Sequence, residues 1–429
     1  MKHLTLGMNT ILALSLGLQA ETLSTDQNST QHKIKPASVR KIVNTNNPIA
    51  HSTLELRLGY IGLNGDGQSR TNAYGLGGHY HLDSKRWNGF MVGISAYTVL
   101  DLGINQNPQN VNGDFFDADG KSFIMLSEIF LDGKWGNTGV KFGRQMLDTP
   151  HADSDDIRMI PNYFEAYTIT NNDIDNVTLS AGFIHEMAGW ENGVDASKFV
   201  NIGETLGTNG VDINGVSYAS INYEGIKDLS LALWYYNYND IANVVYAELG
   251  YEKTFNNETT LTFGLQYDGS KETGAALLGE QNAETYGVSA DFIFESTGVH
   301  LLAAYNQDNG STGATGLSLG GGPFFTSMED QTLDAIGEAG SAWVLGAEYH
   351  FEKIGIDGLH LGIAYGHFEA KDTDSYESDE VDVIMGYTLN KNLSLTAAYA
   401  SVKFNAGTDE NGKPLTDYDQ FRLIVNYNY

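Results

Sequence analysis

Residues 52–62 read STLELRLGYIG, and this short stretch decides the fold. Leu56 and Leu58 alternate with Glu55 and Arg57, so every second side chain is apolar and its neighbours are charged. Successive side chains of a β-strand point to opposite faces, so this period of two separates the leucines from the charges. The stretch therefore predicts one strand of an antiparallel sheet that has an apolar face and a polar face.

The same alternation recurs along the rest of the chain. Residues 258–268 and 341–353 repeat it, and no stretch after residue 20 keeps the 3.6-residue period of an amphipathic helix. The predicted strands span residues 52–62, 71–83, 89–100, 121–132, 136–147, 160–170, 175–188, 215–224, 228–237, 243–254, 258–268, 283–295, 298–306, 341–353, 357–368, 378–389, 391–402 and 416–429.

The connections between these strands alternate in length. Short ones fall at residues 83–88, 171–174, 225–227, 255–257, 296–297 and 390–391, and longer ones centre near residues 66, 110, 153, 200, 240, 275, 325, 373 and 409. Outer-membrane barrels have short periplasmic turns, long extracellular loops and aromatic girdles, and many tyrosines here fall near strand ends on the apolar face. We therefore predict an all-β fold: a transmembrane antiparallel β-barrel of 18 strands with short periplasmic turns and long extracellular loops.

The overall composition, taken by itself, is typical of a soluble acidic protein. The chain has 24 Lys and Arg against 54 Asp and Glu, a net charge of −30, no cysteine and a mean hydropathy of −0.27. Such acidity argues against nucleic acid as a partner, because phosphate contacts need Lys and Arg. The absence of cysteine excludes a disulfide scaffold, thiolate metal sites and cysteine catalysis. The low mean hydropathy argues only against membrane proteins whose spans are helices.

The two ends of the chain carry further signals. Residues 1–20, MKHLTLGMNTILALSLGLQA, have a positive start, an apolar stretch and a small last residue, which is typical of a secretory signal peptide. Residues 21–51 are polar and lack apolar periodicity, so we expect a mobile N-terminal arm before a single barrel over 52–429. The final strand ends on Tyr429, and such an aromatic end resembles the signal read by the bacterial barrel-assembly machinery.

Three longer stretches resemble a known family. Residues 143–167 read GRQMLDTPHADSDDIRMIPNYFEAY, residues 321–366 contain GGPFFTSMEDQTLDAIG and AWVLGAEYHFEKIGIDGLHLGIAYG, and residues 379–402 read DEVDVIMGYTLNKNLSLTAAYASV. They resemble the OprD-type porins of Gram-negative outer membranes. The resemblance implies an eighteen-stranded barrel that passes small polar solutes. It also implies that the third outside loop, about residues 147–160, folds into the lumen and narrows the channel.

By its position in the chain, this loop corresponds to the loop that forms the pore constriction in the resembled family. The resemblance implies that the constriction is lined by Asp153, Asp155, Asp156 and Arg158, with Arg144 at the neighbouring strand end. Opposed carboxylates and guanidinium groups create a transverse field that orients dipolar solutes. The alternative is a solvated loop whose Asp–Arg pairs only fix its shape. The long Gly-rich loop 307–340 is a second candidate for an inward plug.

The alternation also predicts which charges line the lumen wall. Inward positions carry few cations and more acids, namely Arg57, Lys141 and Arg422 against Glu55, Glu128, Glu248, Asp291, Glu348 and Asp382. Many members of the resembled family favour carboxylate substrates and carry a ladder of Arg and Lys along this wall, so the chain departs from them. An acidic lumen concentrates cations and repels anions. We therefore expect passive diffusion of small hydrophilic solutes and ions, with cations preferred.

Other constellations point to fewer functions. The carboxylates Asp372, Asp374, Glu377 and Asp379 suit either a weak Ca²⁺ site that bridges lipopolysaccharide or a solvated acidic tip, and we expect no other cofactor. His79 and His81 share one strand face, a geometry that could bind a metal, but the sequence shows no third ligand for them. Ser154 and His151 lie close in sequence, yet no nucleophile elbow or third triad member accompanies them, so we expect no catalytic residues. An adhesin or receptor, or a barrel hydrolase, remains the alternative function. A homotrimer and a monomer are both compatible with the sequence.

Overall fold

The computed structural model describes residues 48–65, 70–105, 111–255, 258–409 and 412–429. The predicted signal peptide, 1–20, and nearly all of the predicted arm, 21–51, lie outside these residues. The first strand begins at Ile49, so the barrel starts three residues earlier than the alternation alone indicated.

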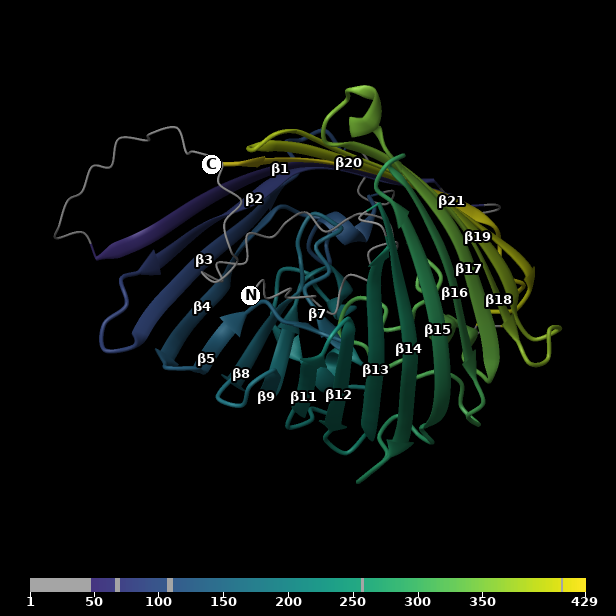
Figure 1. Cartoon of the computed structure of the whole chain (residues 1–429), viewed down its shortest axis with the longest axis horizontal. Helices are drawn as coiled ribbons and strands as arrows, with labels where there is room; N and C mark the ends of the chain where they lie inside the picture. Colours follow the sequence, from purple (N-terminus) through teal and green to yellow (C-terminus); the bar gives the residue numbers. More distant parts are fainter. Residues whose placement is uncertain (1–47, 66–69, 106–110, 256–257, 410–411) are drawn as a thin grey trace.

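Eighteen strands of the described chain form one closed antiparallel barrel, as predicted (Figure 1). They are β1 (Ile49–Gly65), β2 (Thr71–Ser84), β3 (Phe90–Leu100), β4 (Phe123–Trp135), β5 (Thr138–Gln145), β8 (Tyr163–Asn171), β9 (Val177–Ala188), β11 (Val216–Ile226), β12 (Leu229–Tyr238), β13 (Ala242–Phe255), β14 (Thr259–Glu272), β15 (Asn282–Phe294), β16 (Val299–Asp308), β17 (Gly340–His350), β18 (Leu359–Ala370), β19 (Glu377–Asn390), β20 (Leu393–Ala406) and β21 (Tyr418–Asn428). Each pairs with the next along the chain, and β21 pairs with β1 to close the sheet. Closure leaves no sheet edge with unpaired backbone groups.

Short elements lie in the connections. They are β6 (Asp148–Thr149) and β7 (Ala152–Asp153), which pair with each other, β10 (Val200–Asn201), the helix α1 (Ile202–Thr205), and the 3₁₀ turns η4 (Gly113–Phe115), η5 (Trp190–Asn192), η6 (Leu333–Ile336) and η7 (Phe351–Ile354). No helix among the described residues is long and apolar enough to cross a membrane.

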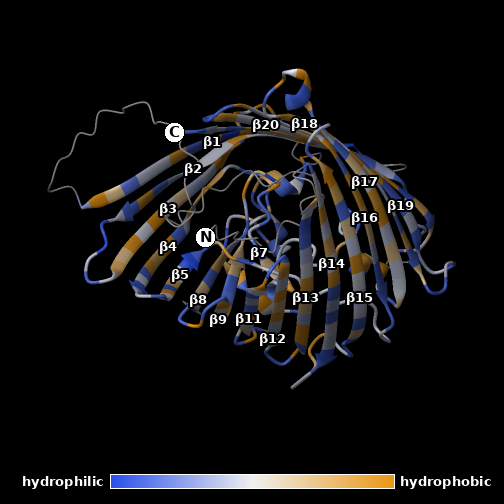
Figure 2. Cartoon of the chain, viewed as in Figure 1, coloured by the Kyte–Doolittle hydropathy of each residue, from blue (hydrophilic) through white to orange (hydrophobic). Residues whose placement is uncertain are grey.

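The wall has the two faces that residues 52–62 predicted. On β1, the outward Leu56 and Leu58 are 46% and 54% exposed, whereas the inward Arg57 is 1% exposed. The hydropathy colouring alternates in the same way along many of the strands (Figure 2). An apolar outer face and a polar inner face are what a barrel in a lipid bilayer requires, because lipid meets one face and water the other.

The connections gather at two ends of the barrel, which we name the turn end and the loop end. Links at the turn end, such as 136–137, 227–228 and 391–392, are mostly tight turns. Links at the loop end include the long segments 101–122, 146–162, 189–215 and 309–339. The predicted alternation has exceptions. The loop-end link near residue 240 has only three residues, 239–241, in which the Ile241 N–H donates to the Tyr238 carbonyl at 3.0 Å, and the turn-end link 351–358 has eight.

The apolar core lies inside the barrel, between its inner wall and the long loops. One cluster joins Tyr97 of β3 to Phe115 and Met159 of two loops, and another joins Tyr236 of β12 to Leu319. A third places Phe324 against Phe368 of β18. The outward apolar side chains of the strands remain exposed. The inward side chains are buried, and much of the surface that covers them comes from the long loops.

Candidate functional site

The 146–162 loop, which joins β5 to β8, contacts opposite parts of the inner wall. The Tyr97 hydroxyl of β3 donates to the Met159 carbonyl at 2.5 Å. At the other side of the loop, His151 Nε2 lies 2.5 Å from a carboxylate oxygen of Asp268 on β14, and both of these side chains are fully buried. Ribbon β7, part of this loop, accordingly lies within the ring of strands (Figure 1).

Glycines on the inner wall make room for this loop. A Cβ atom at Gly59 of β1 would lie 2.4 Å from Met159 Sδ and 2.9 Å from a ring carbon of Phe115. Cβ atoms at Gly75 and Gly77 of β2 would lie 3.2 and 3.0 Å from Met159 Cε. The close approach of the loop to β1 and β2 therefore depends on wall positions without side chains.

The 309–339 loop, which joins β16 to β17, lies beside the 146–162 loop. Ala152 and Leu319 form a parallel bridge between the two, and the Leu319 N–H donates to the His151 carbonyl at 2.9 Å. Gln266 of β14 donates to the Pro323 carbonyl at 2.5 Å, which fixes the middle of the 309–339 loop to the wall.

Acidic residues of β19 fix the far part of the 309–339 loop. Glu380 accepts hydrogen bonds from the backbone N–H groups of Asp330 at 3.0 Å and Gln331 at 2.7 Å. Asp382 accepts from the Glu329 N–H at 3.2 Å. These two wall carboxylates therefore place the Glu329 and Asp330 side chains opposite the 146–162 loop.

A charged cluster forms where the two loops meet β1 and β21. We define it as Arg57, Arg158, Arg422, Asp114, Asp156, Glu329 and Asp330. Arg57 holds Asp156 through two hydrogen bonds of 2.5 and 2.8 Å. Arg158 lies 3.5 Å from Asp114, 3.9 Å from Glu329 and 3.7 Å from Asp330, and Arg422 lies 2.8 Å from Glu329.

Several buried polar atoms of this cluster lack hydrogen-bond partners within the protein. They include Nε and Nη1 of Arg158, Nε of Arg422, and one carboxylate oxygen of Asp330. A buried guanidinium N–H without a partner is costly, so such groups normally bind water or a ligand. The cluster therefore presents donors and acceptors that a polar solute can satisfy.

Burial changes the protonation of the loop carboxyls. It raises the pKa of Glu329 to about 8, against the opposing effect of Arg158. Burial and the neighbouring Asp148 raise the pKa of Asp153 to about 7. The local charge of the two loops therefore varies near neutral pH.

Glu191, in the turn η5, joins three loops. It accepts from the Asn162 side-chain amide at 2.6 Å and from the Gly321 N–H at 3.1 Å. It also shares a hydrogen bond with Asp155, whose pKa burial raises to about 6, and burial raises the pKa of Glu191 well above its ordinary value. One shared proton thus allows two buried carboxyls to lie together.

Of the residues predicted for the constriction, four lie together in the 146–162 loop. Asp156 and Arg158 belong to the charged cluster, and the Asp155 N–H donates to Asp153 at 2.7 Å beside it. Arg144 has other contacts: it lies 3.3 Å from Glu165 of β8 and over the ring of Phe199.

The residues predicted for the lumen wall all occupy inward positions of their strands. Their contacts are Glu55 with Arg57 at 3.1 Å, Glu128 with His81 at 3.2 Å, Lys141 over the Phe130 ring, Glu248 with the Tyr246 hydroxyl at 2.5 Å, Glu348 with His360 at 3.5 Å, and Asp382 and Arg422 with Glu329; Asp291 is 8% exposed. Of this set, Arg57, Arg422 and Asp382 form hydrogen bonds with residues of the 146–162 and 309–339 loops.

The structure does not bring together the residues of the predicted Ca²⁺ site or of the Ser154–His151 pair. Asp379 accepts from Tyr365, His367 and Asn405, while Asp372 caps its own turn by accepting from the Asp374 N–H. Glu377 accepts from Asn405 at 3.3 Å, and no metal-ligand group among the described residues includes any of these four acids. Ser154 donates to Asp148 at 2.7 Å, whereas His151 pairs with Asp268, so these two side chains form no dyad.

Sequence reasoning missed several residues of this site. Glu380 shares its strand face with Asp382, so the alternation that found Asp382 was a usable signal for it. Asp114, Glu329, Asp330 and Glu191 lie in loops without periodicity, and no local pattern marks them. Their roles come from contacts between segments far apart in the chain.

A family model supports the resemblance noted in the sequence. The model described as outer membrane porin, OprD family, matches residues 88–429. No curated protein matches this chain.

Solved structures share the whole fold. OccK9 (OpdG) of Pseudomonas aeruginosa superposes with a TM-score of 0.76 at 20% identity, covering 88% of this chain and 97% of that one. OpdK with vanillate, from the same organism, gives 0.72 at 18% identity over 88% and 98%. OccK2 (OpdF) in complex with glucuronate, also from P. aeruginosa, gives 0.70 at 19% identity over 88% and 97%. At these identities the likeness is one of fold.

Proposed function

Because the chain belongs to the OprD family of outer membrane porins, we propose that it lies in the outer membrane of a Gram-negative bacterium and lets small hydrophilic solutes and ions diffuse passively. The 146–162 loop narrows the water-filled lumen, assisted by the 309–339 loop. The observation that carries this proposal is the charged cluster between these loops and the wall, whose buried donors and acceptors lack protein partners.

The proposed orientation places the turn end in the periplasm and the loop end outside the cell. The start of β1 and the end of β21 then lie on the periplasmic side, and the C-terminal strand β21 is available to the barrel-assembly machinery. The apolar outer face contacts membrane lipid, and the outward acids near the loop end, such as Glu377 and Asp379, face lipopolysaccharide.

Cation preference follows from the balance of charge around the passage. The charged cluster has three arginines and four acids, of which Glu329 is ionised only above its raised pKa of about 8, and the adjoining Glu380 and Asp382 add two more carboxyls. The other charges predicted for the lumen wall add Lys141 against Glu55, Glu128, Glu248, Asp291 and Glu348. An excess of ionised carboxylates attracts cations into a narrow lumen.

A second candidate is a channel for acidic solutes. Its support is that Nε and Nη1 of Arg158 and Nε of Arg422 are buried and make no hydrogen bond within the protein, since guanidinium groups bind carboxylates through two parallel hydrogen bonds. Two solved structures of the same fold hold vanillate and glucuronate, which are both carboxylates.

Planar-bilayer recording tests the proposal. Refolded protein is placed in a KCl gradient, and the sign of the reversal potential reports whether K⁺ or Cl⁻ is preferred. K⁺ preference supports the first candidate, and Cl⁻ preference with faster uptake of glucuronate than of a neutral sugar in liposome swelling supports the second. A folded barrel that does not conduct would overturn both and favour a receptor or adhesin. Conductance steps that occur in threes would support a homotrimer.

A further inference from the structure

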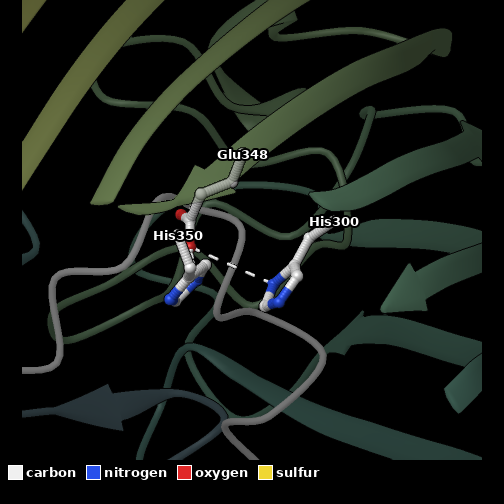
Figure 3. A group of neighbouring side chains, drawn as sticks. All are labelled: His300, Glu348 and His350. Carbon is white, nitrogen blue, oxygen red and sulfur yellow. Dashed lines mark hydrogen bonds and ion pairs between the residues drawn. The ribbon is translucent and has the colours of Figure 1, made fainter. Parts of the chain in front are cut away.

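Three histidines and one glutamate meet on the inner face of β16, β17 and β18 at the turn end. The ligand atoms of His300, Glu348 and His350 all lie within 4.8 Å of one another, and these side chains turn toward a common point (Figure 3). Among the residues that the structure describes, this is the only group of His and carboxylate side chains with such convergence. None of its members touches the charged cluster through the contacts described above.

The strand register fixes the positions of these side chains. His300 lies directly opposite Glu348 in the β16–β17 pairing, and His350 lies directly opposite His360 in the β17–β18 pairing. Neighbouring strands are about 4.8 Å apart, and all four residues occupy inward positions. The group is therefore built on the hydrogen-bonded wall of the barrel, where rigid strands position side chains more accurately than loops do.

The distances approach those of a metal site. Glu348 Oε2 lies 3.5 Å from His360 Nδ1, and Glu348 Oε1 lies 4.0 Å from His300 Nδ1 and in contact with His350 Nε2. Ligands bound about 2.0–2.2 Å from a tetrahedral zinc ion are about 3.4 Å apart. Small side-chain rotations bring these donors to that spacing, and the imidazoles of His300 and His350 already stack with centroids 4.4 Å apart.

His360 completes the set. Its Nδ1 is buried and lies 3.5 Å from Glu348 Oε2, an ion-pair contact without the geometry of a good hydrogen bond. Its ring occupies space left by a glycine: a Cβ atom at Gly386, which lies opposite it on β19, would be 1.9 Å from His360 Nε2. The wall thus makes room for an imidazole whose Nδ1 faces the Glu348 carboxylate.

The geometry points to a binding site for a divalent transition metal ion of the zinc class, formed by His300, Glu348, His350 and His360. Three imidazoles and one carboxylate are a donor set that zinc prefers, whereas Ca²⁺ and Mg²⁺ prefer oxygen ligands alone. Glu295 and Glu352 lie close enough to the histidines to interact electrostatically, and their negative charge favours a cation here. In the proposed orientation the ion sits at the periplasmic mouth of the pore.

The chain offers a matched control at another place on the same end, on β2. His81 also faces inward, but its Nδ1 lies 3.2 Å from Glu128 and its Nε2 lies 3.0 Å from Asp83. Both ring nitrogens therefore have protein partners, and no free donor remains for a metal. His81→Ala removes one inward histidine without touching the proposed site.

Calorimetric titration of the tag-free, refolded and EDTA-treated chain with ZnCl₂ tests the proposal. We expect one zinc ion per chain, with unchanged affinity in His81→Ala. Since loss of a supporting residue alone weakens metal sites about 10–100-fold, loss of two ligands in His300→Ala/His350→Ala should weaken binding at least about 100-fold. Zinc binding by that double variant equal to the parent, or no saturable binding by the parent, would overturn the proposal.

Two further measurements guard against a misfolded variant. Heat-dependent mobility on a gel reports whether each barrel is folded, and the conservative Glu348→Gln replaces the double variant if the latter fails to fold. Co²⁺ in place of Zn²⁺ gives intense visible bands when it has four ligands of this kind, and we expect these bands in the parent and in His81→Ala but not in Glu348→Gln. Bands of equal intensity in Glu348→Gln would contradict the assignment. These readouts need no ion conduction, so their outcome is separate from that of the proposed porin function.

Discussion

At the scale of single residues, Arg158 shows how the candidate constriction is built. Its side chain is only 3% exposed, yet its three acidic neighbours stand 3.5 to 3.9 Å away and its guanidinium lies over the ring of Trp190. Electrostatic attraction to these three carboxylates therefore holds the Arg158 guanidinium more than short hydrogen bonds do. Such an arrangement leaves N–H groups free for water or for a passing solute.

Neutralising Asp155 and Asp156 tests the role of this field. In Asp155→Asn/Asp156→Asn the passage loses carboxylate charge, including the partner of Arg57, so we expect the K⁺ over Cl⁻ permeability ratio to fall by about twofold or more. Reversal potentials in a KCl gradient measure the ratio. Asp372→Asn/Asp374→Asn, in an exposed turn at the loop end, serves as the control and should leave it unchanged. An unaltered ratio in the first variant would place Asp155 and Asp156 outside the conducting path.

The raised pKa values of the loop carboxyls predict a pH dependence. Burial raises the pKa of Glu329 to about 8 and that of Asp153 to about 7, so each group is neutral below that value and negative above it. We expect cation preference to increase as the pH rises from about 6 to about 9. Glu329→Gln should remove the part of this change near pH 8. Reversal potentials measured across this range check the prediction, and a flat profile in the parent protein would refute it.

At the scale of elements, the 146–162 and 309–339 loops are positioned by features of the wall. Glycines of β1 and β2 accept Met159, and carboxylates of β19 bind the backbone of 329–331. The loops also bind each other through the Ala152–Leu319 bridge. Wall and loops therefore form one packed unit. We expect a substitution on a strand that contacts these loops to alter the conformation of the candidate constriction.

Gly59→Val tests this coupling. The new side chain overlaps Met159 and Phe115, so we expect the 146–162 loop to move away from β1 and the single-channel conductance to change in size or become noisy. Gly139→Val on β5 provides the control, because no other group lies within 4 Å of a Cβ atom there. Equal, parent-like conductance in both variants would show that the loop does not depend on the Gly59 contact.

At the scale of the whole molecule, closure between β1 and β21 makes a barrel from a sheet. The two strands pair from Glu55 opposite Asn428 to Gly65 opposite Tyr418, and Leu54 exchanges two backbone hydrogen bonds with Tyr429 at 3.1 and 2.8 Å. Without this pairing two sheet edges would expose their backbone groups, which a membrane cannot satisfy.

Deletion of residues 418–429 should therefore abolish the folded barrel. We expect the shortened chain to lose its heat-dependent mobility on a gel and to form no channels in planar bilayers. Tyr429→Phe keeps the aromatic ring and the backbone hydrogen bonds to Leu54, so it should behave as the parent protein does. A shortened chain that still folds and conducts would contradict the importance of this closure.

The sequence by itself determined the strands, their number and which side chains face inward. Alternation is a local property of the extended backbone, so Arg57, Asp382 and Arg422 were assigned to the inner wall without knowledge of any contact. The tertiary structure alone decided which of them meet. Arg57 pairs with Asp156 across 99 positions and Arg422 with Glu329 across 93, and loop segments have no period from which such contacts follow. The same holds for the histidine group: parity placed Glu348 inward, but only the register of three strands brought His300, His350 and His360 around it.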